Sequence, residues 1–526
     1  MLLSELIRDV ETECIHGPAE REIPDITNDS RKTVSGGLYF AIPGFRVDGA
    51  AFLPDVLKKG AGCVVTEKDT SEIDGILRQA SAGDEEKKAG GDKAVCLADY
   101  PDLTVLRVKN ARKAMGIMSG HFYGDPSEKL TVIGLTGTKG KTTTSVMIRE
   151  MLEKAGHKTG LVGTIEILNG RERIPAANTT PESIKLHEEL KKMLENGLDS
   201  VVMEVSSQGL KLDRVAGVDF DYGIFTNLSP DHIGKDEHSS YEEYRDCKKL
   251  LFGLCRTGIY HTDDPEAAYM MDGAAGRKLT FGRKEDADYR AEDIRLYREG
   301  GVLGTAFRLT GKKNAEVRVD LPGTFSVENA LAAIAVASEM GVPMEKIKEI
   351  LLDIHVRGRV EMIPISNEFT LMIDYAHNAM SLRSLLTSLR AYNPGRIVTL
   401  FGCGGNRAKD RRYGMGEVSG ELSDLSIITS DNPRFEDPQA IIDDIKVGIG
   451  KTSGKYVEII DRKEAVRYAI LNAKPGDLIV LAGKGHEDYQ EICGVKHHMD
   501  ERDLIREVIE ESDVTKICGY HNQYFT

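Results

Sequence analysis

The chain has 526 residues, of which 40% are hydrophobic and 29% charged, and such a composition is typical of a globular protein. Its formal net charge of -15 opposes the basic surface that binding a nucleic-acid backbone requires. No apolar run reaches the roughly 20 residues that cross a bilayer, and the acidic start lacks the basic region of a secretory signal. We therefore expect a cytoplasmic protein that binds no nucleic acid and has no membrane span.

The length is sufficient for about three domains. The eight cysteines include no CxxC pair, so we expect reduced thiols. Residues 1–128 mix short apolar runs, such as 37–42 and 62–67, with turns, and predict a small N-terminal α/β domain. Within this domain the polar stretch 68–93 is rich in charge and glycine and predicts a solvated loop insertion.

A second domain is predicted over residues 129–355. Residues 130–137 have the apolar pattern of a buried strand, and residues 141–156 that of an amphipathic helix ending near a glycine. Further apolar strands follow at 200–205 and 222–226, each running into a polar segment. This order is typical of a parallel sheet that binds a nucleotide at the carboxyl ends of its strands.

A third domain is predicted over residues 356–526. After a helix-like run at 326–341, apolar strands appear at 369–376, 396–402, 425–430 and 477–483, and each ends at polar or glycine-rich residues. That alternation predicts a Rossmann-like parallel sheet with a second site along one edge. The predicted fold class is therefore α/β with three domains.

A glycine-rich loop between the strand at 130–137 and the following helix is the sharpest local motif. Its glycines let backbone N–H groups approach phosphate oxygens, Lys141 supplies a cation, and Thr142 can bind Mg²⁺. Leu135 stands where a strict Walker A loop has glycine, so the loop is a shorter GxxGKT form. The residues expected to bind ATP here are Gly137, Thr138, Lys139, Gly140, Lys141, Thr142 and Thr143.

The loop sequence LTGTKGKTTT resembles the ATP loop of the Mur ligase family and its folylpolyglutamate synthetase relatives. Three later motifs, NTTPES (178–183), MEVSS (203–207) and TNLSPDH (226–232), resemble in order those of UDP-N-acetylmuramoyl-tripeptide synthetases. The resemblance implies that Glu204 and His232 are catalytic residues that help to place Mg²⁺. It also implies that the muramoyl peptide is held by Asn178, Thr179, Thr180, Ser206 and Arg214.

The segment YEEYRDCKKLLF resembles the family stretch that carries a carbamylated lysine. Alignment on Tyr244 and Phe252 places the modified residue at Lys248, with Lys249 as the adjacent alternative. A carbamate formed from CO₂ turns the cation into an anion with oxygen ligands for Mg²⁺, which prefers them. Together with Lys141, Lys248 is therefore expected to act in catalysis and in metal binding.

Further resemblances concern the remaining ligands. In relatives the segments around Asn329, Arg359 and Asp374 contact the adenine, phosphate and ribose of ATP. The N-terminal segments DSR and PGFRVDG resemble contacts to uridine diphosphate, which implies roles for Ser30, Phe45, Arg46 and Val47. This chain reads DYAHNAMSL after the strand at 369–376, where many members have a Pro-Asp pair.

Three motifs of the third domain, GCGGNR, DNPR and GKGHE, concern the incoming amino acid. DNPR resembles the signature of synthetases that add meso-diaminopimelate, whose distal carboxylate can pair with an arginine guanidinium, whereas lysine offers no such group. The residues implied to bind diaminopimelate are Arg407, Asp431, Asn432, Pro433, Arg434, Gly483 and Glu487.

The expected function is an ATP-dependent amide ligase that adds meso-diaminopimelate to UDP-N-acetylmuramoyl-L-alanyl-D-glutamate through an acyl phosphate. Its expected partners are these small-molecule substrates with ATP and Mg²⁺, and the expected state is a monomer. Two alternatives stay open at the level of sequence. One is a related ligase that adds L-lysine or another amino acid, and the other is a regulatory protein switched by ATP.

Overall fold

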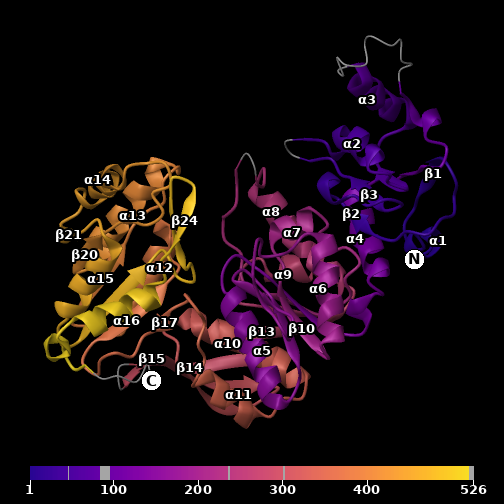
Figure 1. Ribbon diagram of the computed structural model, residues 1–526. Helices are drawn as coiled ribbons and strands as arrows, with labels where there is room; N and C mark the ends of the chain where they lie inside the picture. Colours follow the sequence, from indigo (N-terminus) through magenta and orange to yellow (C-terminus); the bar gives the residue numbers. More distant parts are fainter. Residues whose placement is uncertain (45–46, 83–94, 235–236, 300–301, 521–526) are drawn as a thin grey trace. The chain divides into compact units, whose positions relative to one another are not determined.

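The computed structural model describes residues 1–44, 47–82, 95–234, 237–299 and 302–520, and many of its elements are labelled in Figure 1. Contacts divide the chain into two compact units. Unit 1 comprises Met1–Lys141, Gly156–Tyr260 and Asp264–Leu279, and unit 2 comprises Thr142–Ala155, His261–Asp263 and Thr280–Thr526. Among the helices of the described residues, none is both long enough and apolar enough to cross a bilayer.

The N-terminal part of unit 1 is a five-stranded sheet in the order β1-β5-β4-β3-β2. Strands β2 to β5 are parallel, and β1 pairs with β5 in the antiparallel sense. The predicted apolar runs at 37–42 and 62–67 form β3 and β4. The elements are α1 (Leu3–Leu6), β1 (Glu13–His16), β2 (Ile26–Thr27), β3 (Leu38–Ala41), α2 (Leu53–Lys58), β4 (Cys63–Thr66), α3 (Thr70–Ala82), β5 (Thr104–Arg107) and α4 (Ala111–Phe122).

Helix α3 corrects the prediction of a loop over residues 68–93. The first part of that stretch is helical, because Ile73 and Leu77 lie one turn apart and are buried in the N-terminal core. Asp69 begins the helix, since its carboxylate accepts from the N–H of Glu72 while its own N–H donates to the Glu72 side chain. The polar composition concealed these two apolar positions. Residues 83–94 of the same prediction lie outside the described residues.

Residues 131–282, most of which belong to unit 1, include strands in the order β12-β11-β6-β10-β7-β8-β9. The strands β12, β11, β6, β10 and β7 are parallel, as predicted, whereas β8 and β9 add an antiparallel edge. The elements are β6 (Thr131–Thr136), α5 (Lys141–Ala155), β7 (Thr159–Val162), β8 (Glu166–Leu168), β9 (Arg173–Pro175), α6 (Ser183–Glu195), β10 (Ser200–Glu204), α7 (Ser207–Lys211), β11 (Phe220–Phe225), α8 (Tyr241–Lys249), β12 (Cys255–His261), α9 (Ala267–Met271) and β13 (Arg277–Gly282).

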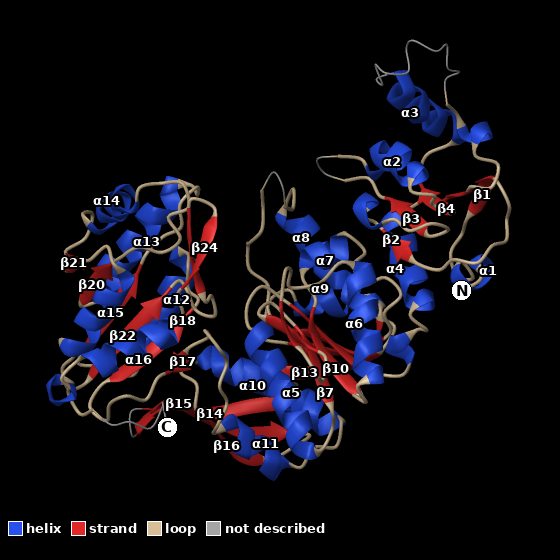
Figure 2. Cartoon of the chain, in the orientation of Figure 1, coloured by secondary structure: helices blue, strands red, loops and turns tan. Residues whose placement is uncertain are grey.

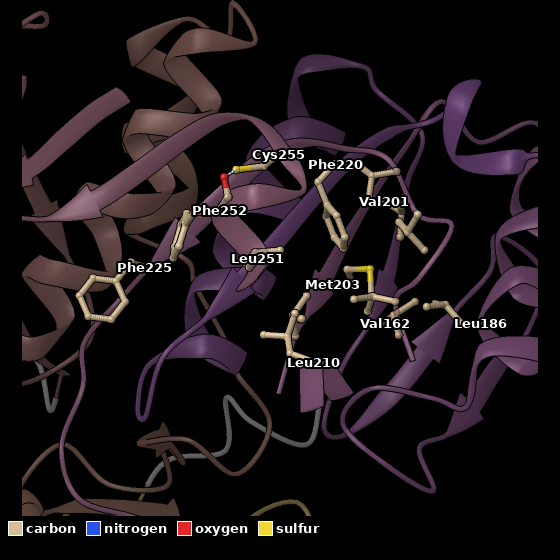
Figure 3. Close-up of a cluster of buried hydrophobic side chains, with 14 of the residues drawn as sticks. Val162, Leu186, Val201, Met203, Leu210, Phe220, Phe225, Leu251, Phe252 and Cys255 are labelled. Atoms are coloured by element: carbon tan, nitrogen blue, oxygen red, sulfur yellow. Dashed lines mark hydrogen bonds between the residues drawn. The ribbon is translucent and has the colours of Figure 1, made fainter. Parts of the chain in front are cut away.

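One face of this sheet packs against helices through a continuous hydrophobic core, shown in part in Figure 3. Val201 and Met203 point to this core because alternate residues of a strand face the same side. Leu186 of α6 and Leu210 of α7 meet them, and all four side chains are almost fully buried. The core fixes the carboxyl ends of β6 and β10, from which the predicted site residues project.

In unit 2, strands β14 (Tyr289–Glu299), β15 (Val302–Gly311) and β16 (Ala315–Val319) form an antiparallel meander. These three strands were not predicted from the sequence. The helices α10 (Thr324–Glu339) and α11 (Met344–Leu351) follow the meander. The predicted helix at 326–341 coincides with α10 to within two residues at each end.

A six-stranded sheet in the order β17-β18-β22-β19-β20-β21 forms the C-terminal part of unit 2 (Figure 2). All neighbouring strands are parallel except β17 with β18, so the predicted Rossmann-like arrangement is present. The elements are β17 (Glu361–Met362), β18 (Thr370–Asp374), α12 (Ala379–Arg390), β19 (Arg396–Phe401), α13 (Lys409–Leu422), β20 (Leu425–Ile428), α14 (Pro438–Ile449), β21 (Tyr456–Glu458), α15 (Arg462–Leu471), β22 (Asp477–Ala482), β23 (Tyr489–Ile492), β24 (Val495–His498) and α16 (Glu501–Glu511).

This sheet is covered on both faces. Leu478 and Val480 of β22 join a core with α12, α13 and α14, whereas Ile479 and Leu481 join a second core with α15 and α16. A strand buried on both sides needs apolar residues at consecutive positions, which is why β22 reads DLIVLA. The polar residues after each strand therefore lie at the edge of a rigid sheet.

Candidate active site

The glycine-rich loop follows β6 and opens α5, as predicted. Gly137 has φ +153°, and a Cβ at this position would lie 2.0 Å from the Thr226 hydroxyl oxygen, so only glycine fits. The Thr226 hydroxyl donates to the Lys139 carbonyl over 2.8 Å, and the Lys139 N–H donates to the Asn227 side chain over 2.9 Å. The loop is therefore fixed by the first two residues of the TNLSPDH motif.

Two lysines converge on this loop. The Nζ atoms of Lys141 and Lys248 each donate to the Gly137 carbonyl oxygen over 2.8 Å. Lys248 is 1% exposed, and burial, with a further contribution from Lys141, lowers its pKa well below the usual range. Lys249 lies instead near Asp272, at 3.6 Å, and over the ring of Tyr269. The geometry therefore separates the two lysines that the sequence left as alternatives.

Helix α8 presents Lys248 together with Tyr244, one turn earlier on the same face. The Lys248 nitrogen lies 4.5 Å from the centroid of the Tyr244 ring, and the Tyr244 hydroxyl is 3.1 Å from that of Thr138. Burial raises the pKa of Tyr244, so the phenol stays protonated. Tyr244 served only as an alignment point in the sequence, and its spacing of four residues from Lys248 was the signal for this contact.

Glu204 ends β10 as a carboxylate that is 1% exposed. Both of its oxygens accept hydrogen bonds of 2.9 Å from Thr164, one from the backbone N–H and one from the hydroxyl. The Thr164 hydroxyl is in turn 3.1 Å from that of Thr179. Sequence reasoning did not single out Thr164, which follows β7 and is brought to Glu204 by the parallel pairing of β7 with β10.

Several residues predicted to bind the muramoyl peptide form one hydrogen-bonded group beside Glu204. The Thr180 hydroxyl donates to the Glu204 carbonyl over 3.0 Å and accepts from the Ser206 N–H over 2.9 Å. Arg214 donates to the Thr180 carbonyl over 3.0 Å and pairs with Glu182. Asn178, at the start of the motif, is exposed.

His232 lies in a different setting, with φ +54° and an exposed ring. Its Nδ1 is 3.0 Å from the Glu237 carboxylate. Across the described residues, no three His, Cys, Asp or Glu side chains are clustered so as to hold a metal ion. The donor chemistry nevertheless fits Mg²⁺, since Glu204 is a buried, oriented carboxylate and a carbamate on Lys248 would add oxygen ligands.

The residues predicted to contact uridine diphosphate lie in the N-terminal part. Ser30 begins a single 3-10 turn, Ser30–Lys32, and its carbonyl accepts from Lys59 over 2.7 Å. Val47 is an exposed hydrophobic residue. Phe45 and Arg46 lie outside the described residues.

The three residues predicted to contact ATP from outside the glycine-rich loop are all placed by local contacts. The Asn329 side chain on α10 accepts from the Thr144 hydroxyl of α5 over 3.3 Å. The Arg359 guanidinium lies 4.8 Å from the Tyr375 ring centroid. Asp374 ends β18, and its two carboxylate oxygens accept over 2.8 Å from the N–H groups of Val360 and Ala376. Asp374 therefore also holds the segment around Arg359.

The three motifs predicted for the amino acid converge at the carboxyl edge of the C-terminal sheet. Arg434 donates to the Gly405 carbonyl over 2.9 Å and to the Glu491 carboxylate over 3.1 Å. The Asn432 carbonyl accepts from the Gly405 N–H, and its side chain donates to Glu487 over 2.9 Å. GCGGNR, DNPR and GKGHE therefore form one cluster.

The other residues predicted for this cluster differ in exposure. Asp431 is buried, and a Cβ on Gly483 would lie 3.3 Å from its carboxylate, so the backbone of Gly483 passes close to it. Pro433 packs its carbonyl against Gly405. Arg407 is exposed. Lys484, which sequence reasoning passed over, is fully buried within the cluster.

Comparisons with known proteins agree with this arrangement. Three family models match successive segments, described as Mur ligase family, catalytic domain (residues 22–123), Mur ligase middle domain (135–337) and Mur ligase, glutamate ligase domain (358–485). The UDP-N-acetylmuramoyl-L-alanyl-D-glutamate--2,6-diaminopimelate ligase of Caldanaerobacter subterraneus is 41% identical over 98% of this chain and 100% of its own length. The ligase of the same name from Clostridium perfringens is 37% identical over 97% and 100%.

A solved structure titled with the same ligase name is 28% identical, with a TM-score of 0.65 over 93% of this chain and 95% of that one. The fold is therefore the three-domain α/β fold that the sequence predicts. The chain belongs to the Mur ligase family of ATP-dependent acid–amino-acid ligases.

Proposed function

We propose that this ligase adds meso-diaminopimelate to UDP-N-acetylmuramoyl-L-alanyl-D-glutamate during synthesis of the peptidoglycan precursor. The single observation that carries the proposal is Arg434, whose guanidinium is oriented by Glu491 and by the Gly405 carbonyl within a cluster that includes Glu487. A guanidinium suits the second carboxylate of diaminopimelate, and the Glu487 carboxylate suits an ammonium. The names of the full-length relatives support the same substrates.

The proposed reaction has two steps. The free carboxylate of the D-glutamyl residue attacks the γ-phosphorus of ATP, forming an acyl phosphate and releasing ADP. The amine of diaminopimelate then attacks the acyl carbon, so that an amide bond forms, inorganic phosphate leaves and the amine loses a proton. Because the reacting groups are anions that repel one another, we expect the protein to act mainly by positioning and by charge neutralisation, with Lys141 beside the phosphates.

We propose that Lys248 is carbamylated in the active enzyme. Two amines that contact one carbonyl oxygen repel one another if both are protonated, and burial already favours the neutral form of Lys248. A neutral amine can attack the carbon of CO₂ to form an N–C bond and release a proton to solvent, and the resulting carbamate anion would face Lys141 with the opposite charge. Mg²⁺ would then be held by the Lys248 carbamate, Glu204 and His232, where it would lower the charge repulsion between carboxylate and phosphate.

We propose that each of the three domains binds one of the substrates. We place the domain boundaries so that residues 1–128 bind the UDP moiety, 129–355 bind ATP, and 356–526 bind the amino acid. The three successive family matches support this division. We further propose that the protein works as a monomer in the cytoplasm, where its nucleotide-linked substrates are made.

The test is phosphate release by the purified protein with ATP, Mg²⁺ and the UDP-muramoyl dipeptide, comparing meso-diaminopimelate, L-lysine and no amino acid. Diaminopimelate alone should stimulate turnover. Arg434→Ala should raise KM for diaminopimelate about 10- to 100-fold, the usual cost of a charge-assisted contact, whereas Arg383→Ala, which breaks a surface pair with Glu421, should not. Stimulation by L-lysine would favour the lysine-adding alternative, and ATP hydrolysis independent of the dipeptide would favour the ATP switch.

A further inference from the structure

Lys484 is a fully buried cation within the cluster proposed to bind the amino acid. It is the second residue of GKGHE, between β22 and β23, and its side chain is 0% exposed. Its Nζ donates to three oxygens, namely the Asn432 side chain at 3.0 Å, the Glu487 carboxylate at 2.7 Å and the Tyr489 carbonyl at 2.5 Å. A lysine ammonium has three N–H donors, so these contacts saturate it.

The contact with Lys484 determines how the Asn432 amide is oriented. Its oxygen accepts from Lys484 and also, over 2.9 Å, from the backbone N–H of Glu491. The amide NH₂ must therefore point the other way, and it donates to Glu487 over 2.9 Å. If the amide were turned by 180°, its NH₂ group would face two other donors, Lys484 and the Glu491 N–H. These two donors together therefore fix the orientation of the amide.

The same cation also fixes Glu487. The donors from Lys484 and Asn432 both reach the Oε2 atom of this carboxylate. Neither of them uses Oε1, which is left to accept from a further donor. The buried Lys484 ammonium lies 2.7 Å from this Oε2 atom and compensates the charge of the carboxylate.

We propose that Lys484 is the positioning residue of the amino-acid pocket, which holds Glu487 and the Asn432 amide in the arrangement that receives the ammonium group of the incoming amino acid. This inference rests on the proposed function. It assigns to Lys484 no contact with the substrate, since all three of its donors are used within the protein. Its effect should therefore reach substrate binding only through Asn432 and Glu487.

The experiment compares Lys484→Met with Lys496→Met in the full-length enzyme. Lys496 is the matched control because its ammonium also contacts Tyr489, 3.9 Å from the ring centroid. Unlike Lys484, however, Lys496 is exposed, on strand β24. Lys484→Met should raise KM for diaminopimelate about 10- to 100-fold, the range for losing a hydrogen bond to a charged group, and change KM for ATP less than about twofold. Lys496→Met should leave both values unchanged.

A double-mutant cycle distinguishes positioning from a general loss of packing. Glu487→Gln should raise KM for diaminopimelate on its own, and adding Lys484→Met to it should cost clearly less than in the wild type, because the lysine acts through the glutamate. Lys484→Arg carries the same test if the methionine variant does not fold, since the planar guanidinium keeps the charge but cannot reproduce the three contacts.

The outcomes separate this inference from the proposed function. If the wild type shows no diaminopimelate-stimulated turnover, the proposed function fails. If the wild type is stimulated but a folded Lys484 variant keeps its KM for diaminopimelate, the inference is overturned. Equal rises in KM for ATP and for diaminopimelate, or full additivity with Glu487→Gln, would also overturn it.

Discussion

Lys141 and Lys248 donate to the same oxygen, the carbonyl of Gly137, over 2.8 Å each. The first belongs to the glycine-rich loop and the second to α8, more than 100 residues later in the chain. Two protonated amines would repel one another at this carbonyl. Burial first, and the neighbouring Lys141 second, lower the pKa of Lys248 and so favour its neutral amine, the form that our proposed carbamylation requires.

Methionine at position 248 should abolish the carbamate and lower turnover by about 100-fold or more, the scale for losing a preorganised charge in an active site. The matched control is Lys249→Met, because Lys249 faces Asp272 and Tyr269. In ¹³C-labelled bicarbonate, a carbamate resonance should appear in the wild type and in Lys249→Met and be absent from Lys248→Met. A carbamate signal that survives in Lys248→Met would place the modification elsewhere.

The depressed pKa of Lys248 predicts how stability varies with pH. Between its folded pKa and the unfolded value near 10.4, the unfolded state binds more protons, so the cost of burying this amine grows as pH falls. In CO₂-free buffer, Lys248→Met should therefore be more stable than the wild type, and by a larger margin at pH 7 than at pH 9. Urea unfolding at both pH values measures the difference, and an equal margin at both would contradict the assignment.

Gly137→Ala should damage the ATP loop. The added Cβ would lie 2.0 Å from the Thr226 hydroxyl oxygen, and φ there is +153°. We expect a loss of about 1–3 kcal/mol in unfolding free energy and a raised KM for ATP. Gly75→Ala in α3 is the control, because its Cβ meets open space, and it should stabilise the protein by about 0.5–1 kcal/mol. Normal ATP kinetics in folded Gly137→Ala would show that the loop tolerates a side chain.

A buried ion pair holds the two strand ends that precede the DNPR and GKGHE motifs. Arg462 and Glu501 pair over 2.7 Å, and Arg462 also donates to the carbonyls of Ser430 and Ala482, which precede the DNPR and GKGHE motifs. Arg462→Met should cost about 3–5 kcal/mol in unfolding free energy, since it leaves the Glu501 carboxylate buried without its partner.

Removing the second charge from this pair should recover much of the loss. Burial raises the pKa of Glu501, so without the arginine the buried carboxylate destabilises the folded state. The double variant Arg462→Met with Glu501→Leu should therefore be clearly more stable than Arg462→Met. Arg467→Met, on the surface of the same helix, should cost at most about 1 kcal/mol. A double variant no more stable than the single one would contradict this view of the pair.

Local patterns predicted much of the fold. The strands before the glycine-rich loop and in the C-terminal sheet were found because apolar runs end at polar residues, and Lys248 followed from alignment on neighbouring aromatics. Helix α3 was missed because its apolar face has few residues, with Ile73 and Leu77 buried and Ile76 partly buried, in an otherwise polar stretch. The β14 to β16 meander was missed because its long antiparallel strands alternate apolar and polar residues. They therefore lack the continuous apolar runs by which the other strands were found.

The partners of the site residues could not be predicted from the sequence. Thr164 reaches Glu204 across 40 positions, and Lys484 reaches Asn432 across 52. Such contacts arise from the parallel pairing of strands, which brings distant strand ends to one edge. Motif resemblance names the residues that touch a ligand, whereas the residues that orient them become visible only in three dimensions.

The most direct test of the central claim is the identity of the product. The purified protein is incubated with the UDP-muramoyl dipeptide, ATP, Mg²⁺ and an equimolar mixture of meso-diaminopimelate and L-lysine, and the UDP-linked products are weighed by mass spectrometry. We predict the diaminopimelate tripeptide, one ADP for each product molecule, and no lysine adduct. A lysine tripeptide, or ADP without any tripeptide, would contradict the proposed function.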